Sequence, residues 1–209
     1  MKYSKVEFGQ IEAVLNKLGG IDGMRHFLAG KTKVVPVSEA ARKSAKKPVR
    51  KPGVLVREGS FSAVELVARH DPKEFYRTGG NLYVWSDFTN WIVAAASPTE
   101  AGKKFKKTAF WKLSQNATGE VLRSARPKDV WNATDFCAWL AFKLANQPNG
   151  ELGELLNTGY ANLFLVKGVN SGVFVVSVRW RSVRREWHVF AWNLGREWNP
   201  GDRFASKPI

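Results

Sequence analysis

A basic stretch without aromatic residues divides this chain and limits what it can fold into. Residues 31–53 hold eight Lys or Arg side chains against a single acid, Glu39, and they include three prolines. Such a composition cannot bury enough apolar surface to offset the conformational entropy lost on ordering. We therefore expect a flexible linker between an N-terminal module, residues 1–30, and a main domain, residues 54–209.

The charge of the chain points toward a polyanionic partner. The sequence has 33 Lys and Arg against 18 Asp and Glu, a formal net charge of +15 and a pI near 10.1. The linker alone contributes eight positive charges minus one, or +7. It is either an arm that releases counterions as it lies along phosphates or a solvated spacer. On the first interpretation its phosphate contacts are Lys46, Lys47, Arg50 and Lys51.

Composition excludes several classes of protein. A hydrophobic fraction of 44% with 12% aromatic residues is too high for a wholly disordered chain. No apolar run reaches the roughly 18 residues that a membrane-spanning helix needs, and residues 1–30 lack the apolar core of a secretory signal, so we expect a cytoplasmic protein. The single cysteine, Cys137, excludes an internal disulfide and a thiolate-rich zinc site.

The sequence of the N-terminal module predicts a pair of short helices. A capping box at residues 4–7 begins a helix whose apolar residues from Ile11 to Leu18 recur at helical spacing, and a glycine pair ends it. Asp22 can cap a second, shorter helix. Two helices of this size cannot bury their apolar faces alone, so they must dock on the main domain or on a partner protein. A helix–turn–helix reader and a KH-type GxxG loop are poorer interpretations, because Asp22 would repel phosphate and the second helix offers few base-reading side chains.

Two segments carry a resemblance to other proteins. The stretch GQIEAVLNKLGGIDGMRHFLAG, residues 9–30, resembles a short N-terminal module in an uncharacterised protein family of candidate-phyla (Patescibacteria-type) bacteria. The stretch QPNGELGELLNTGYANLF, residues 147–164, and the tryptophan-rich end through residues 201–204 are similar to one branch of that family. The resemblance implies a bacterial cytoplasmic protein with a modular N-terminal segment, and it implies no activity or site.

The main domain mixes helical and extended patterns. Helices early and strands late predict an α+β fold with an antiparallel sheet. The helix over 135–146 is apolar almost all round, so we expect it to be buried. The predicted elements are a helix from Ser62 toward His70, a helical turn after Asp71, a strand over 81–86, a helix over 87–96, a strand over 104–113, the helix over 135–146 and a strand over 160–167.

A closing β-hairpin is the strongest local prediction. Two aromatic and β-branched runs, residues 173–181 and 186–193, flank a four-residue loop. This loop length pairs Arg181 with Glu186, Trp180 with Trp187, and Arg179 with His188. One face of the hairpin is then core. The other face mixes cations with aromatic rings: Ser177, Arg179, Arg181, His188, Phe190 and Trp192.

No catalytic or cofactor signature emerges. The three histidines share no metal-ligand spacing with one another or with Cys137, which sits in the helix expected to be buried and is therefore an inert thiol. His188 is the one histidine worth testing for catalysis, although a structural role is more typical of such a position. Glu151 and Glu154 form either a carboxylate pair or the acidic start of a helix. We expect no cofactor and no metal.

Basic residues alternate with aromatic residues in two places, which is a pattern typical of single-stranded nucleic-acid binding. The tryptophans expected in the core are Trp131, Trp139, Trp180 and Trp187, and those expected on a binding face are Trp85, Trp111, Trp192 and Trp198. We therefore expect a non-catalytic nucleic-acid-binding protein, with RNA favoured over DNA. Outside the linker its contacts would be Lys103, Lys104, Lys106, Lys107, Trp111, Arg179, Arg181, His188 and Trp192. The alternatives are a protein–protein adaptor that docks through residues 1–30 and a hydrolase that uses His188.

Overall fold

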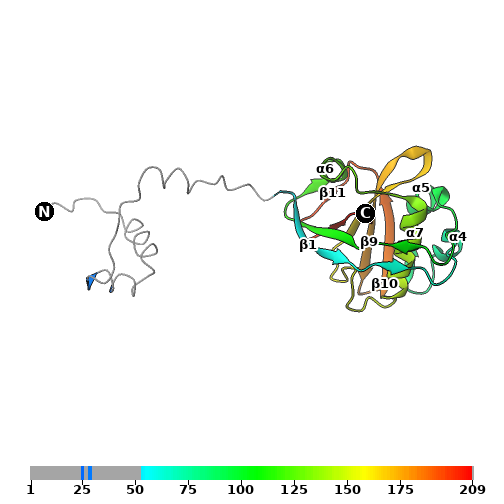
Figure 1. Cartoon of the computed structure of the whole chain (residues 1–209), viewed down its shortest axis with the longest axis horizontal. Coiled ribbons are helices and arrows are strands. Elements are labelled where there is room, and N and C mark those ends of the chain that lie inside the picture. Colours follow the sequence, from blue (N-terminus) through cyan, green and yellow to red (C-terminus); the bar gives the residue numbers. More distant parts are fainter. Residues whose placement is uncertain (1–24, 26–27, 30–52, 209) are drawn as a thin grey trace. The chain divides into compact units, whose positions relative to one another are not determined.

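The computed structural model describes Arg25, Leu28, Ala29 and residues 53–208. The chain divides into two compact units, residues 1–50 and residues 51–209 (Figure 1). The predicted N-terminal helices, apart from those three residues, and the linker contacts Lys46, Lys47, Arg50 and Lys51 lie outside the described residues. No helix within the described part of the chain is both long and apolar enough to cross a bilayer.

The second unit has an α+β fold built on one large sheet, as predicted. Within residues 53–208, eight strands form this sheet, with seven of them in a continuous order and β7 beside β8. The order is β1 (Leu55–Phe61), β5 (Thr108–Leu113), β12 (Arg203–Ala205), β8 (Asn162–Lys167), β9 (Val173–Arg181), β10 (Glu186–Trp192) and β3 (Leu82–Val84), and β7 is Val130–Asn132. The predicted antiparallel pairing holds for β1–β5, β5–β12, β8–β9 and β9–β10, but the sheet is mixed, because β3–β10, β12–β8 and β7–β8 pair in parallel.

Both faces of the sheet are buried, and the central strand shows why. Strand β8 is an unbroken apolar run flanked by Asn162 and Lys167, and all its residues before Lys167 are buried. Phe164 and Val166 point into one core, and Leu163 and Leu165 point into the other. A strand covered on both sides needs apolar residues at successive positions. The domain therefore has two apolar layers, one on each side of the sheet.

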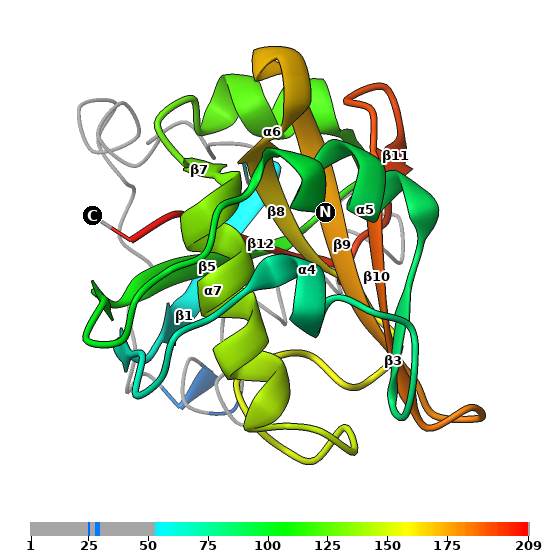
Figure 2. The same ribbon diagram turned by 90° about the vertical axis from the view of Figure 1, so that its right-hand side faces the viewer.

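The helices divide between these two layers. Figure 2 shows α7 (Ala133–Ala145) lying across one face of the sheet, with α4 (Pro72–Phe75) and α5 (Ser86–Trp91) beside it. The short strands β2 (Val64–Glu65) and β4 (Lys104–Phe105) bury Val64 and Phe105 in this same layer. The opposite layer is closed by α6 (Gly119–Ala125) and by the pair β6 (Ala117–Thr118) and β11 (Glu197–Trp198).

The predicted hairpin and the predicted buried helix are confirmed. Strands β9 and β10 pair in the expected register, including Arg181 with Glu186 and Arg179 with His188. The long helix, α7, begins two residues earlier than expected because Asn132 caps it, accepting the Asp135 N–H at 2.8 Å. Asp71 also caps α4 as expected.

The predicted helix from Ser62 toward His70 is wrong. The capping-box pattern required the Ser62 side chain and Glu65 to satisfy helix donors. Instead the Ser62 N–H donates to Glu154 Oε1 at 2.5 Å, and the next residues pair with Lys104 and Phe105 as β2. A contact with a residue 92 positions away thus overrides the local signal. Residues 150–156 likewise form no helix, so the interpretation of Glu151 and Glu154 as the acidic start of a helix is wrong. Glu151 accepts hydrogen bonds from Asn149, and Glu154 accepts them from Ser62 and Lys143.

Candidate nucleic-acid interface

Two parallel strands share one edge of β8 and define where a groove forms. Because β9 occupies one edge of β8 along its length, β12 and β7 must both use the other edge. Strand β12 ends opposite Phe164, and β7 begins opposite Leu165. Beyond β12 the chain turns toward β5, where the Ser206 N–H donates to the Ala109 carbonyl at 2.9 Å. The junction of β12, β7 and the start of α7 is therefore left open.

The first concavity at this junction, which we name the lysine hollow, has a volume of about 540 Å³. Its apolar floor includes Phe105, Val130 and Trp131, and Asp135 is the one carboxylate among its lining residues. Lysines from three distant segments of the chain surround this floor. They are Lys103, Lys104, Lys106, Lys167 and Lys207.

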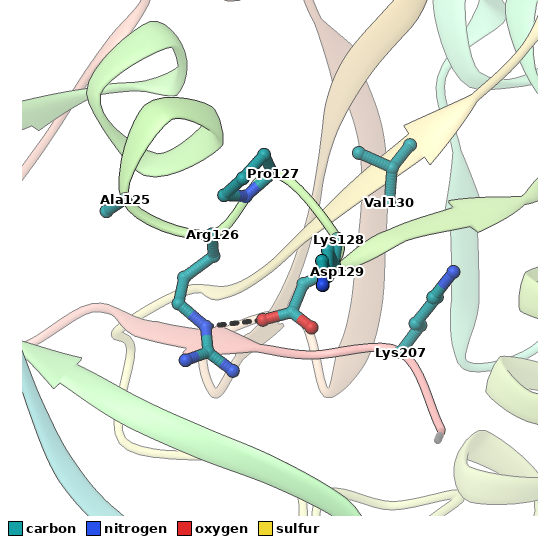
Figure 3. A pocket seen from close by; sticks show the side chains of 7 residues that line it. All are labelled: Ala125, Arg126, Pro127, Lys128, Asp129, Val130 and Lys207. Atoms are coloured by element: carbon teal, nitrogen blue, oxygen red, sulfur yellow. Dashed lines mark hydrogen bonds and ion pairs between the residues drawn. The ribbon is translucent and has the colours of Figure 1, made fainter.

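A second hollow of about 640 Å³ adjoins the first and shares Val130 and Lys207 with it. Ala125 and Pro127 give it an apolar wall, and Arg126, Lys128 and Asp129 add charged groups. Figure 3 shows Arg126 and Lys207 on either side of the Asp129 carboxylate. We name the two hollows together the basic groove.

Carboxylates neutralise only part of the charge in the basic groove. Asp129 is buried and accepts a hydrogen bond from Arg126 Nε at 2.5 Å, and Lys103 Nζ lies 3.1 Å from Asp135 Oδ1. Lys104 Nζ lies 3.3 Å from Glu65, on the neighbouring strand β2. Four further lysines line the basic groove and form no ion pair within residues 53–208: Lys106, Lys128, Lys167 and Lys207. The groove therefore presents excess positive charge to solvent.

The sequence prediction found part of this groove. Lys103, Lys104 and Lys106 line it, whereas Lys107 is exposed but lines neither hollow. The prediction missed the cations that other segments contribute. These are Arg126, Lys128, Lys167 and Lys207. Each of the four is isolated from the 103–107 run in sequence, so no local pattern marks it.

The hairpin face does not offer its rings as a flat platform. Phe190 stacks between Trp85 and Trp192, with centroid distances of 4.7 and 5.4 Å and interplanar angles of 27° and 22°. The guanidinium of Arg196 then lies 3.7 Å from the centroid of the Trp192 ring. Protein groups therefore already stack on Phe190 and Trp192, whereas Trp85, at the end of the column, is 42% exposed.

Three aromatic predictions require correction. His188 is buried, its ring stacks on Tyr83 at 5.0 Å and its Nε2 lies 2.8 Å from Glu186 Oε1, so it is not the exposed residue that the prediction of nucleic-acid contact requires. Trp111 is 7% exposed and Trp198 is buried as well, because the second apolar layer covers both. The guanidinium of Arg126 also lies over the Trp111 ring at 4.1 Å. The four tryptophans predicted to be core are buried.

The cations of the hairpin face differ in their availability. Arg179 is half-buried, with Nη2 3.9 Å from Asp202 Oδ1, and burial lowers its pKa although Asp202 opposes the shift. Arg181 is exposed near the loop. The Cys137 thiol is buried in α7 as predicted, and burial raises its pKa, which disfavours the reactive thiolate. Among the described residues no group of three His, Cys, Asp or Glu side chains could hold a metal ion.

His70 should make the stability of the domain depend on pH. Its Nε2 is buried without a hydrogen-bond partner, and Phe75 and Tyr76 pack around its ring. Burial lowers the pKa of His70 below 6.5, with Asp71 opposing the shift. The unfolded chain therefore binds the proton of His70 more tightly than the folded chain does. The stability that the neutral His70 contributes is complete above pH 6.5 and is lost as pH falls toward the folded-state pKa.

We expect His70→Gln to flatten this part of the stability profile. Urea unfolding of both proteins at a series of pH values below 7 would measure it. The wild-type free energy of unfolding should fall more steeply with decreasing pH than that of the variant. Parallel profiles would show that His70 does not change protonation on unfolding.

Comparisons of the chain with protein-family models, with curated proteins and with solved structures each return no match.

Proposed function

We propose that this protein binds nucleic acid through the basic groove, without catalysis and with RNA favoured over DNA. One observation carries the proposal: seven cationic side chains from separate segments of the chain meet at two adjoining hollows. Such a concentration of positive charge is repulsive in the free protein and favourable against phosphates.

The shape of the groove favours single strands and loops over a duplex. The two hollows have volumes of about 540 and 640 Å³, and each has an apolar floor or wall beside its cations. Unpaired nucleotides can turn their bases out of a strand and place them in such hollows, whereas duplex bases stay stacked inside the helix. RNA presents unpaired loops and ends of this kind more often than DNA does, which is the reason for the order of preference.

The size of the expected effect follows from the salt dependence of phosphate binding. Each phosphate that a lysine neutralises in a single strand contributes about −0.7 to the slope of log affinity against log salt. Removing two contacts should therefore reduce the slope by roughly 1.4. The loss should not depend strongly on base sequence, because phosphate contacts carry no sequence information.

The experiment compares two double variants of equal charge in the full chain. Lys167→Ala with Lys207→Ala removes two groove lysines, and Lys73→Ala with Lys112→Ala removes two exposed lysines that line neither hollow. Fluorescence anisotropy of a labelled mixed-sequence single-stranded RNA would be measured between about 50 and 300 mM salt. We expect the groove variant to lose about tenfold in affinity with the shallower slope. The control should stay near wild type.

Two results would overturn the proposal. Equal losses in the two double variants would mean that binding follows net charge and not the groove. No binding by the wild-type chain at the lowest salt would remove nucleic acid as the partner. Thermal unfolding of all three proteins should coincide, because each substituted lysine is exposed.

A further inference from the structure

The lysine hollow concentrates more charge than one backbone phosphate requires. Five lysines line a single concavity of about 540 Å³, and two of them are paired with carboxylates, Lys103 with Asp135 and Lys104 with Glu65, which leaves three that form no ion pair. A phosphodiester in a strand carries a single negative charge, and successive phosphates are spaced along the chain. A terminal phosphate monoester carries about −1.5 to −2 at pH 7 and has three acceptor oxygens. The hollow therefore matches a monoester better than a diester.

The backbone around the hollow adds to this match. Asn132 pairs with Lys167 where the parallel strands β7 and β8 end, and both residues line the hollow. Ligands of sheets with parallel strands commonly lie beyond the carboxyl ends of those strands.

The adjoining hollow can hold the remainder of such a ligand. Its wall of Ala125, Pro127 and Val130 is apolar, and the shared residues Val130 and Lys207 make it continuous with the lysine hollow. Arg126 and Asp129 supply a guanidinium and a carboxylate at its edge (Figure 3). A nucleoside offers the complementary pair, an apolar ring face and polar ring edges.

We infer that the lysine hollow binds the phosphate monoester of a nucleotide, with the nucleoside in the adjoining hollow. The nucleotide is either the phosphorylated end of a nucleic-acid strand or a free mononucleotide, since both present the same chemistry. This inference rests on the proposed function, of which it names the ligand group.

The test uses one RNA sequence in three forms: with a 5′-phosphate, with a 3′-phosphate and with hydroxyl groups at both ends. Anisotropy titrations of the full chain should show about tenfold tighter binding of one phosphorylated form over the unphosphorylated form. Lys167→Ala should abolish that preference, and Lys112→Ala, the matched control outside the groove, should keep it. Adenosine 5′-monophosphate should displace the preferred RNA, and adenosine should not.

The outcomes separate this inference from the function on which it rests. Equal affinity for all three RNA forms, with a normal salt slope, would overturn the monoester site and leave nucleic-acid binding intact. Absence of binding to every form would overturn both. If the monophosphate binds as tightly as the phosphorylated RNA, the monoester site stands and its ligand is the free nucleotide. If it displaces the RNA only weakly, the ligand is a strand end.

Discussion

Replacing Gly168 with alanine is expected to lower the free energy of unfolding by about 3 kcal/mol. A Cβ at this position would lie 2.1 Å from the backbone carbonyl oxygen of Trp91 and 3.1 Å from both Ile92 Cδ1 and the Phe174 ring. A flexible side chain can move aside, but a backbone oxygen at the end of α5 cannot move without displacing the helix. Both Ile92 and Phe174 also belong to, or pack against, the larger apolar layer.

Gly79→Ala provides the matched control. No atom lies within 4 Å of a Cβ built on Gly79, and its φ is not in the left-handed region. We expect that variant to stay within about 0.5 kcal/mol of wild type. Urea unfolding followed by tryptophan fluorescence would compare the three proteins. Coincident transitions for Gly168→Ala and Gly79→Ala would mean that the segment after β8 can shift away from α5.

The position of Gly168 connects stability to the basic groove. It directly follows Lys167, which lines the lysine hollow at the end of β8. The close approach of Gly168 to Trp91 fixes where β8 ends, and it thereby fixes the backbone that carries Lys167.

Local patterns were sufficient where an element's partner is close in sequence. The β9–β10 register follows from a four-residue loop and two alternating runs, so Arg179 was placed opposite His188 correctly. Helix α7 has a capping asparagine and an almost continuous apolar surface, which no strand of that length would need. The sequence pattern within each of these two elements is therefore sufficient to predict it.

The mixed sheet was not predictable, because its parallel pairings join short and distant segments. Strands β7 and β12 have three residues each, too few for alternation to identify them. Each pairs with β8 only because the two apolar layers bring them to its free edge. The false helix at Ser62 has a similar origin, since its partner Glu154 lies far away in sequence.

The candidate site was predicted in part for the same reason. The run of lysines from Lys103 to Lys107 is visible in the sequence, but Lys167 and Lys207 join it only through the fold. The burial of Trp111 and Trp198 depends on the second apolar layer, which α6, β6 and β11 supply. Alternation along a strand identifies two faces, but it does not say whether the second face is covered.

Removing the Glu154 carboxylate should destabilise the domain more than removing the buried cation that it binds. Lys143 is 4% exposed, its Nζ contacts Glu154 Oε2, and it lies 5.5 Å from the centroid of the Trp139 ring. Apart from Glu154, its hydrogen-bond acceptor is the Ser62 carbonyl oxygen at 3.3 Å. Glu154→Ala therefore leaves an ammonium buried among aromatic rings, at a cost of about 3 kcal/mol.

The opposite deletion should cost less because the two partners differ in exposure. The Glu154 side chain is 34% exposed, so in Lys143→Met its carboxylate still reaches water and the Ser62 N–H. Methionine also keeps the length and the apolar contacts of the lysine stem. We expect a loss of about 1 kcal/mol for this variant, and we expect the double variant to be more stable than Glu154→Ala alone.

The ion pair of Lys143 and Glu154 should also make the stability of the domain depend on pH. Burial raises the pKa of Glu154, but hydrogen bonds from Lys143 and Ser62 outweigh burial and leave it below 4.5. The stability that this carboxylate contributes is therefore complete above pH 4.5 and is lost as pH falls through its folded-state pKa.

Urea unfolding at pH 7, where the Glu154 carboxylate is ionised, tests the ranking of the variants. Lys143→Met should be more stable than the double variant, and Glu154→Ala should be the least stable. If Glu154→Ala were instead as stable as Lys143→Met, water would have hydrated the Lys143 ammonium, and the stability of the fold would not depend on the Lys143–Glu154 ion pair.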